Sequence, residues 1–192
     1  MSDFNFVSQP VLGGFSQESQ GVSITEQISL GIVSVACPNN GDEALAASAK
    51  KAFCCSLPDV SGVEVSDGGT MRWLGLQPQQ WFVLFEHGAD QGDPLAIIKD
   101  QLGDTAYCTD QSDSWVSLEI SGPLAISALE RICPIDLHPA VFPVAAVART
   151  TMEHLGVIIT RTGDDQFLMM SAASSADSFL HAITTSVKNI TA

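Results

Sequence analysis

The stretch DQSDSWVSLEISGPLAISALERICPIDL, residues 110–137, contains the change of period that decides the fold. Apolar residues alternate up to Ile120, as they do in a strand with one buried face, and a Ser-Gly-Pro turn follows. Beyond the turn the apolar spacing is that of a helix, and Pro123 is expected in its first turn because no amide hydrogen is needed there. The stretch therefore predicts a strand, a sharp joint and a helix.

The polar residues at this joint fit three interpretations: a nucleophile on a sharp turn, an anion cradle, or a plain corner. A hydrolase nucleophile needs Gly-x-Ser-x-Gly, and Ser121 lacks the flanking glycines. A phosphate cradle needs several glycines and usually a lysine, whereas this joint has a single glycine and no cation. We therefore expect Gly122 to make the turn and Pro123 to begin the helix.

Upstream of the joint, the chain reads β-α-β-β-α-β, give or take one hairpin. This is the ferredoxin-like order, in which two helices cover one face of an antiparallel sheet. In the first helix Leu45, Ala49 and Phe53 form the apolar stripe, and Asn40 or Asp42 is the expected cap. The predicted strands are 26–37, 60–67, 70–77, 80–86 and 105–110, and the predicted helices are 38–55 and 93–104.

Downstream of the joint, a related series of elements begins. An irregular connection with three prolines occupies residues 133–144. The final helix would be capped by Ser174 or Ser175. The predicted strands are 115–121, 146–152, 155–161 and 165–171, and the predicted helices are 122–132 and 174–189.

Together these elements predict an α+β fold with two packed lobes. Residues 21–110 make the ferredoxin-like lobe, and residues 111–192 make a second lobe, in which helices pack on an antiparallel sheet. Residues 1–20 are rich in Ser, Gln and Gly without a period, and we interpret them as a flexible arm. Because no long polar linker separates the lobes, they should pack as one body.

The charge of the chain excludes two classes of partner. Its 22 acidic residues outnumber 8 basic ones, the net charge is −14, and no Lys or Arg precedes Lys50. Such a field repels a nucleic-acid backbone, and it equally opposes binding to an anionic membrane surface. We therefore expect partners that present basic or apolar patches, with no nucleic acid and no membrane among them.

The cysteines and the N-terminal residues indicate a cytoplasmic protein. The 5 cysteines form no spaced framework, and the adjacent Cys54 and Cys55 would make a strained disulfide, so we expect reduced thiols. The start of the sequence, MSDFNFVSQP, has neither the basic residues nor the apolar core of a signal peptide. The longest apolar stretch is too short to span a bilayer and contains proline.

No group of residues has the spacing of a metal site. The histidines, at positions 87, 138, 154 and 181, are neither four apart on a helix nor joined to Cys-x-x-Cys pairs. Asp136 could orient the imidazole of His138, but a loop histidine beside proline is more often structural. The many carboxylates lie at turns, as acidic residues commonly do because their side chains bond the local backbone.

Two arginines are of interest because arginine is scarce in this chain. Arg149 and Arg161 lie on consecutive predicted strands, where each could contact a carboxylate of a ligand or a partner. Pairing with the abundant local acids is the favoured interpretation. The residues by themselves therefore predict no catalytic, cofactor-binding or metal-binding side chain in this chain.

Several segments nevertheless carry a resemblance. DQSDSWVSLEISGPLAISALERI at 110–132, with GVIITRTGDDQFLMMSAASSADSFLHAI at 156–183, resembles the folate-binding domain of the aminomethyltransferase (glycine-cleavage T protein) superfamily. More specifically, LGLQPQQWFVLFE, CPIDLHPAVFP and ARTTMEHLGVIITRTGDDQFLMM resemble the gamma subunit of heterotetrameric sarcosine oxidase. The resemblance covers roughly residues 22–187, in order and with sensible spacing. Each motif is weak alone, and the set is specific.

The chain departs from the catalytic relatives of that superfamily at one important place. Those relatives follow Thr-Gly with a Gly-Glu-Asp-Gly run, whose glutamate helps to hold the pterin, whereas this chain reads RTGDDQF. Asp164 and Asp165 are near that position but are not equivalent to the glutamate. The long middle segment that carries the catalytic aspartate of those enzymes has no counterpart here. The resemblance therefore implies a folate-domain scaffold that has lost its chemistry.

The resemblance also implies an assembly. The family's complex demethylates sarcosine oxidatively to glycine, yielding hydrogen peroxide and formaldehyde or methylenetetrahydrofolate. The resemblance implies that the alpha, beta and delta partner subunits bind FAD, FMN, NAD, tetrahydrofolate and zinc. It also implies that this chain alone binds none of them. The alternatives are a gamma-type subunit of a related N-methyl amino acid dehydrogenase (N-methylglutamate or dimethylglycine), a stand-alone folate-dependent aminomethyltransferase-like protein, and a small binding module.

Overall fold

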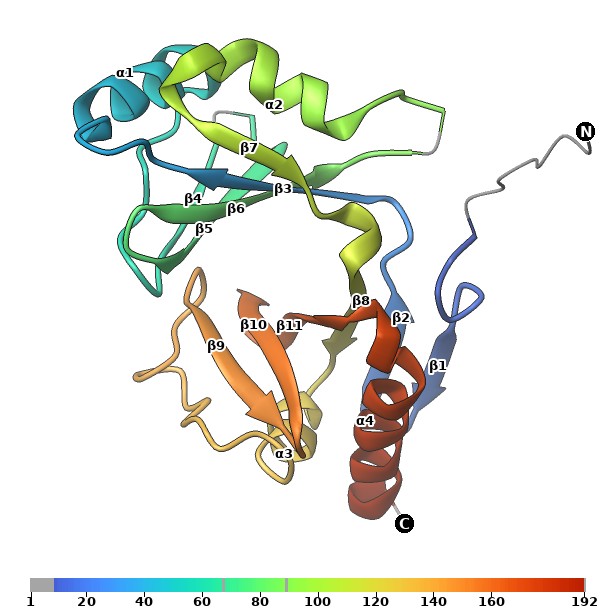
Figure 1. The fold of residues 1–192 in the computed structure, drawn as a ribbon. Coiled ribbons are helices and arrows are strands. Elements are labelled where there is room, and N and C mark those ends of the chain that lie inside the picture. The colour runs from blue at the N-terminus through green and yellow to red at the C-terminus, as the bar shows by residue number, and fades with distance from the viewer. Residues whose placement is uncertain (1–8, 67, 89, 192) are drawn as a thin grey trace, which may run out of the picture.

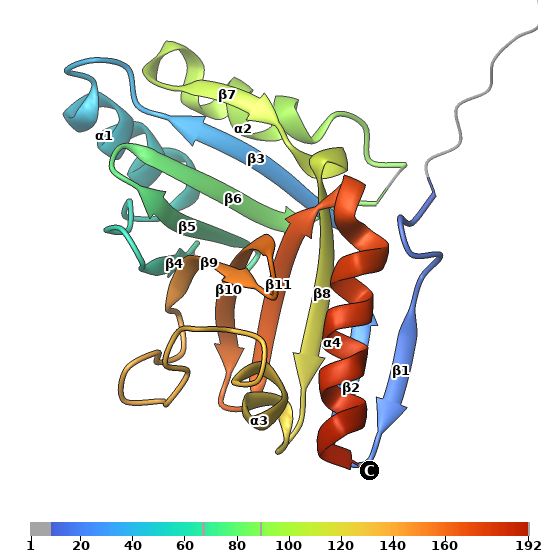
Figure 2. The ribbon, with the colours of Figure 1, turned by 60° about the horizontal axis from the view of Figure 1, so that its bottom comes forward.

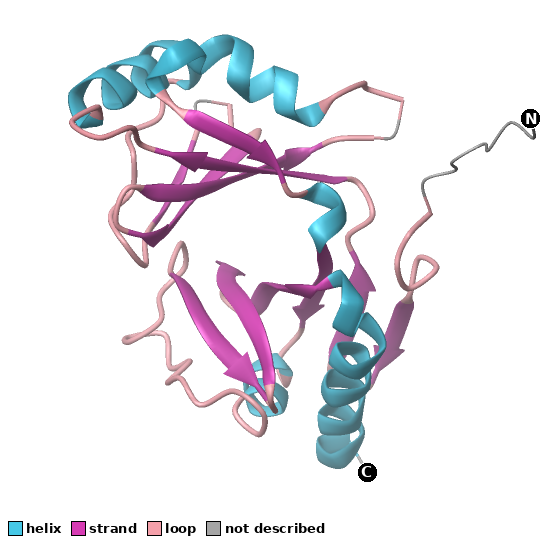
Figure 3. Cartoon of the chain, in the orientation of Figure 1, coloured by secondary structure: helices cyan, strands magenta, loops and turns pink. Residues whose placement is uncertain are grey.

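The computed structural model describes residues 9–66, 68–88 and 90–191 of the chain. These residues form a six-stranded and a five-stranded antiparallel sheet, and the two sheets pack against each other (Figures 1 and 2). Helices cover the outer face of each sheet, as the colouring by secondary structure makes plain (Figure 3). The predicted α+β class with two packed lobes is confirmed.

The first lobe, as we call the five-stranded sheet with α1 and α2, has the predicted ferredoxin-like order. Its strands run β4-β5-β6-β3-β7, and the short β4 is the additional strand at one edge. Both helices lie on the face that turns away from the other sheet (Figure 1). The elements are β3 (Leu30–Ala36), α1 (Asp42–Phe53), β4 (Val63–Val65), β5 (Met71–Gln77), β6 (Gln80–Glu86), α2 (Pro94–Leu102) and β7 (Tyr107–Asp110).

Helix α1 shows which parts of the helix prediction were right. The stripe Leu45, Ala49 and Phe53 is buried against the sheet, and the ring of Phe53 lies 5.6 Å from that of Trp73. The predicted cap was wrong, because Gly41 occupies the N-cap position and no side chain caps the helix. Burial of the apolar stripe therefore stabilises this helix, whereas a capping side chain would affect only its N-terminal end.

The second lobe consists of the six-stranded sheet with α3 and α4. Its strands run β1-β2-β8-β11-β10-β9. The sequence order of β9, β10 and β11 and the turns between them agree with the prediction. The elements are β1 (Ser16–Ser19), β2 (Val22–Glu26), β8 (Trp115–Ser121), α3 (Ala125–Leu129), β9 (Val147–Met152), β10 (Leu155–Gly163), β11 (Gln166–Ala172) and α4 (Ala176–Thr191).

Strands β1 and β2 depart from the expected division of the chain. The N-terminal hairpin joins the second lobe, because β2 pairs with β8 and places Ile24 beside Ile120. Val22 and Ile24 are buried in the same core as α4, which accounts for the pairing. The arm expected at 1–20 therefore contains a paired strand from Ser16 to Ser19, while residues 1–8 lie outside the described residues.

The helices of the second lobe differ in length. Helix α3 begins at Ala125, so Pro123 lies in the turn before the helix rather than in its first turn. Helix α4 is longer and amphipathic, and it buries Phe179, Ile183 and Val187 against the sheet. Since those residues are spaced four apart, one stripe of α4 supplies the packing face.

The inner faces of the two sheets form a separate apolar core. Leu74 and Leu84 of the first lobe pack with Ile158 and Met170 of the second, and all four are almost fully buried. At its margin the rings of Phe82 and Trp115 meet edge to face, with centroids 5.7 Å apart. This continuous core makes the two lobes one body.

Among the described residues, no helix is long and apolar enough to cross a membrane.

Candidate functional site

The strand-to-helix joint is a corner made by Gly122. Its φ is +114°, and a Cβ at this position would lie 2.5 Å from the carbonyl oxygen of Gly21. The amide of Gly122 donates to the carbonyl oxygen of Asp165 at 2.9 Å, and the amide of Leu124 donates to that of Gly21 at 3.1 Å. Ser121 is the last residue of β8 and pairs with Gln166 of β11. The joint thus fastens three segments of backbone, which supports the corner interpretation.

Arg161 is the most buried charged side chain of the described residues, with 3% of its surface exposed. Its Nε donates to the carbonyl oxygen of Gly163 at 3.2 Å, and Nη1 donates to those of Leu137 and Phe142 at 3.2 and 3.0 Å. Nη2 donates to the carbonyl oxygen of Asp164. A single guanidinium therefore holds the irregular 137–142 connection against the β10–β11 turn.

The expectation that the arginines pair with local acids was wrong for Arg161. All its hydrogen bonds go to main-chain carbonyls, and its guanidinium carbon lies 5.2 Å from the centre of the Phe167 ring. The guanidinium carbon of Arg149, on β9, lies 6.0 Å from the ring centre of Phe82 on β6. Both arginines contribute to packing, and Arg149 does so between the lobes.

Asp136 and His138 form a local turn rather than a catalytic pair. The Oδ1 of Asp136 accepts from the main-chain amide of His138 at 2.8 Å, not from its ring. The Nδ1 of His138 accepts from the amide of Ala140 at 3.2 Å. Both side chains are exposed. These local hydrogen bonds fit the structural interpretation of this loop histidine.

A buried carboxylate that sequence reasoning missed holds the N-terminal residues in place. Glu26, at the end of β2, is 6% exposed, and its carboxylate accepts from the amides of Leu12, Gly14 and Phe15 at 2.9, 2.7 and 3.1 Å. The signal was present in VSITE, where Glu26 follows Val22 and Ile24 on the buried face of the strand. A charged residue at such a position needs hydrogen-bonding partners, and the main chain of residues 12–15 supplies them.

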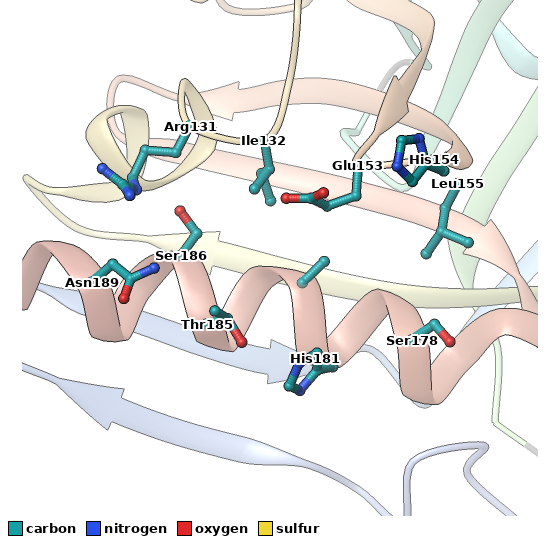
Figure 4. A pocket seen from close by; sticks show the side chains of 11 residues that line it. Arg131, Ile132, Glu153, His154, Leu155, Ser178, His181, Thr185, Ser186 and Asn189 are labelled. Carbon is teal, nitrogen blue, oxygen red and sulfur yellow. The ribbon is translucent and has the colours of Figure 1, made fainter.

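A pocket of about 460 Å³ lies between α4, the loop that follows α3 and the β9–β10 turn (Figure 4). Arg131 and Ile132 come from the loop, and Glu153 comes from the turn. Asn189 and the buried Ser186 come from α4. The pocket joins residues that are distant in sequence, so nothing in their spacing indicated that they meet.

The histidines do not meet as metal ligands. His87 follows β6 and bonds through Nε2 with the carbonyl oxygen of Gly92 at 3.0 Å. His154 lies in the β9–β10 turn, and His181 lies on α4; both line the pocket described above. Residues 9–66, 68–88 and 90–191 contain no group of three or more His, Cys, Asp or Glu side chains placed to hold a metal ion.

The cysteines are free thiols, of which Cys55 and Cys133 are buried, Cys37 and Cys108 are partly buried and Cys54 is exposed. Burial raises the pKa of the Cys55 thiol to about 11, with Glu64 adding to the shift and Lys50 opposing it. Burial also raises the pKa of the Cys133 thiol, against lowering contributions from hydrogen bonds with Ile135 and Thr150. These two thiols are therefore neutral at physiological pH, which is the wrong state for a nucleophile or a metal ligand.

Comparison with known proteins gives the family. The family model "Sarcosine oxidase, gamma subunit family" matches residues 38–187. The chain belongs to the sarcosine oxidase gamma subunit family. It is 32% identical over 149 residues to the sarcosine oxidase subunit gamma of Corynebacterium sp. (strain P-1), which is 76% of this chain and 70% of that one. It is 29% identical over 160 residues to that of Corynebacterium sp. (strain U-96), covering 83% of this chain and 74% of the relative.

Solved structures agree with this membership. A chain of the heterotetrameric sarcosine oxidase from Corynebacterium sp. U-96, in complex with pyrrole 2-carboxylate, superposes with a TM-score of 0.75 and 26% identity. The match covers 89% of this chain and 86% of that one. The glycine cleavage system aminomethyltransferase T of Bartonella henselae matches with a TM-score of 0.58 and 14% identity, over 85% of this chain and 45% of that one. The second likeness shows a shared fold.

Proposed function

We propose that this gamma-family chain is a non-catalytic subunit of a heterotetrameric sarcosine oxidase, and that its two lobes act together as one gamma-type domain. The observation that carries the proposal is the family match over residues 38–187, together with the structural match along 89% of the chain. The oxidase demethylates sarcosine oxidatively to glycine, releasing hydrogen peroxide and formaldehyde or forming methylenetetrahydrofolate. We place the complex in the cytoplasm.

In this proposal the alpha, beta and delta subunits bind the cofactors, namely FAD, FMN, NAD, tetrahydrofolate and zinc. The gamma chain's own turn at RTGDD supports that division. Arg161 at its base is engaged by main-chain carbonyls, and Asp164 and Asp165 at its tip are exposed. The Arg161 side chain is therefore used to fix the turn, which fits a packing role.

Exposed apolar side chains also support a role in assembly. Val60, Val141 and Val144 are 50%, 61% and 48% exposed. Val141 and Val144 lie on the connection between α3 and β9, whose carbonyl oxygen at Phe142 is held by Arg161. Apolar side chains on a fixed loop suit contact with another subunit better than contact with water.

The experiment is to purify the tagged chain from its own host, identify the proteins that accompany it and record the visible absorption spectrum. A yellow complex with three further subunits that oxidises sarcosine is the expected result. If the complex oxidises N-methylglutamate or dimethylglycine instead, the chain is a gamma-type subunit of a different demethylase. A colourless, solitary chain would contradict the subunit role, and titration with tetrahydrofolate would then separate a folate-dependent enzyme from a binding module.

A further inference from the structure

We propose that the pocket between α4, the loop after α3 and the β9–β10 turn binds a small zwitterionic amino acid, with Arg131 taking its carboxylate and Glu153 taking its ammonium group. The pocket belongs to the gamma chain itself. The proposal goes beyond the subunit role and holds whether or not that role does.

The placement of the two charges is the first argument. Figure 4 shows the Glu153 carboxylate pointing along the pocket toward Ile132, while the Arg131 guanidinium lies on the other side of Ile132 in this view. A cationic and an anionic group thus lie on one side of the pocket with an apolar side chain between them. A ligand that carries both charges, separated by a short carbon chain, matches this order.

The availability of these groups is the second argument. The side chains of Arg131 and Glu153 are both exposed, so their charged groups are accessible to a ligand in the pocket. The chain has only 8 Lys and Arg residues, and Arg149 and Arg161 are occupied with aromatic rings and carbonyls. Arg131 therefore provides an accessible cation to this pocket.

The walls of the pocket are fixed before any ligand binds. The amide of Glu153 donates to the carbonyl oxygen of Ile132 at 3.0 Å, which ties the β9–β10 turn to the loop after α3. The hydroxyl of Ser186 donates to the carbonyl oxygen of Ala128 at 2.6 Å, which ties α4 to α3. A volume of about 460 Å³ lies within the range of about 300–1,000 Å³ that is usual for small-molecule sites.

Charge balance selects a zwitterion over a simple ion. An anion attracted by Arg131 would also meet Glu153 and the field of a chain whose net charge is −14. A cation attracted by Glu153 would meet the positive charge of Arg131. Only a ligand with both charges gains from both groups, and its short carbon chain can lie on Ile132 and the buried Ala182.

The test is protection from alkylation at a cysteine placed in the pocket. Thr185 on α4 lines the pocket and is exposed, so Thr185→Cys in the tagged chain should react with N-ethylmaleimide. The chain is labelled in whatever assembly it forms in its host, and modification of residue 185 is followed by peptide mass spectrometry, separately from the native thiols. The probes are glycine, β-alanine and γ-aminobutyrate at millimolar concentration, with acetate and methylamine as single-charge controls.

We expect at least one of the three zwitterions to slow labelling at residue 185 severalfold, and neither single-charge control to do so. The protection should disappear in Arg131→Gln and in Glu153→Gln, but remain in Arg72→Gln and Glu64→Gln, which change exposed residues of the other lobe. No protection by any zwitterion, equal protection by acetate or methylamine, or protection that survives Arg131→Gln would overturn the proposal. A residue 185 that cannot be labelled in the assembly would also overturn it, because a partner chain would then cover the pocket.

Discussion

The two lobes place their charged residues differently. In the first lobe the core between the sheet and its helices consists of apolar side chains, and short turns connect most of its elements. In the second lobe two charged side chains, Glu26 and Arg161, are almost fully buried. Each of them holds an irregular segment through main-chain atoms, residues 12–15 for Glu26 and residues 137–142 for Arg161.

The comparison explains where buried charge is used in this fold. A loop has main-chain donors or acceptors that no ladder or helix pairs, and burying them unpaired is costly. The carboxylate of Glu26 supplies acceptors to one loop, while the guanidinium of Arg161 supplies donors to the other. The first lobe also contains an irregular connection, residues 54–62, but a neutral group holds it: the indole Nε1 of Trp81 donates to the carbonyl oxygen of Pro58 at 2.9 Å.

The largest expected effect is that of Arg161→Met. Methionine keeps much of the side-chain volume but leaves the carbonyl groups of Leu137, Phe142, Gly163 and Asp164 without this donor. We expect the free energy of unfolding to fall by about 3 kcal/mol or more, given about 1–3 kcal/mol for each buried group left unpaired. Urea unfolding of the complex or of the isolated chain measures the loss.

The matched control for that prediction is Arg149→Met, which loses only a contact with the ring of Phe82 and an exposed charge. It should cost about 1 kcal/mol or less. Limited proteolysis would locate the destabilised segment, since in Arg161→Met the chain should be cut within residues 137–145 before it is cut in the first lobe. If both variants lost the same free energy of unfolding, the hydrogen bonds of Arg161 to main-chain carbonyls would contribute no more to stability than the ring contact of Arg149.

A substitution at the joint of β8 and α3 should have the next largest effect. Gly122→Val forces a branched side chain into a backbone with φ +114° and brings its Cβ to 2.5 Å from the carbonyl oxygen of Gly21. We expect a loss of about 2–3 kcal/mol from strain of this kind, measured by thermal unfolding. Ser121→Ala, one residue earlier, should unfold at the wild-type temperature. A large effect of Ser121→Ala on turnover would revive a nucleophile at the joint.

Glu26→Gln tests the other buried charge. Glutamine keeps one oxygen acceptor and exchanges the other for an amide nitrogen, which faces main-chain donors rather than acceptors. The change should cost about 1–2 kcal/mol and expose the peptide bonds near Leu12 to protease. Glu18→Gln, on the exposed face of β1, is the control and should behave as wild type. Unchanged protease resistance in Glu26→Gln would show that packing of Leu12 and Phe15 holds the segment without the carboxylate.

The smallest effect concerns alkaline pH and belongs to the first lobe. Burial raises the pKa of the Cys55 thiol from 9.0 to about 11. The folded chain therefore keeps a proton that the unfolded chain loses, so this contribution to stability is complete below pH 9 and is lost as the pH rises toward 11. Cys55→Ala should flatten the decline in unfolding free energy over that interval. An identical decline in the variant would contradict the assignment to Cys55.

Sequence reasoning succeeded for elements that depend on neighbouring residues. The stripe of Leu45, Ala49 and Phe53 indicates the one buried face of α1, while the continuous apolar runs of β5 and β6 fit strands that are buried on both faces. The ferredoxin-like order follows from the succession of these elements. The role of Gly122 was predicted because the turn contains no nucleophile motif, so the glycine was expected to serve the backbone conformation alone.

The rest depended on contacts between distant segments. Pairing of β2 with β8 joins residues 23–26 to residues 118–121, so the N-terminal hairpin could not be assigned to the second lobe in advance. The hydrogen bonds of Arg161 go to main-chain carbonyls, which every residue has and no sequence pattern marks. The pocket beside α4 likewise joins Arg131, Glu153 and Asn189 only after folding.

The central claim is that this gamma-family chain contributes structure to an oxidase and no catalytic group. It is tested most directly by sarcosine turnover per bound flavin in complexes purified with wild-type chain, Arg161→Met and Gly122→Val. We predict that both variants lower the yield of complex while turnover per flavin in the assembled fraction stays at the wild-type value. Full assembly with turnover reduced by orders of magnitude would contradict the claim, because the altered residue would then act in the reaction rather than in the fold.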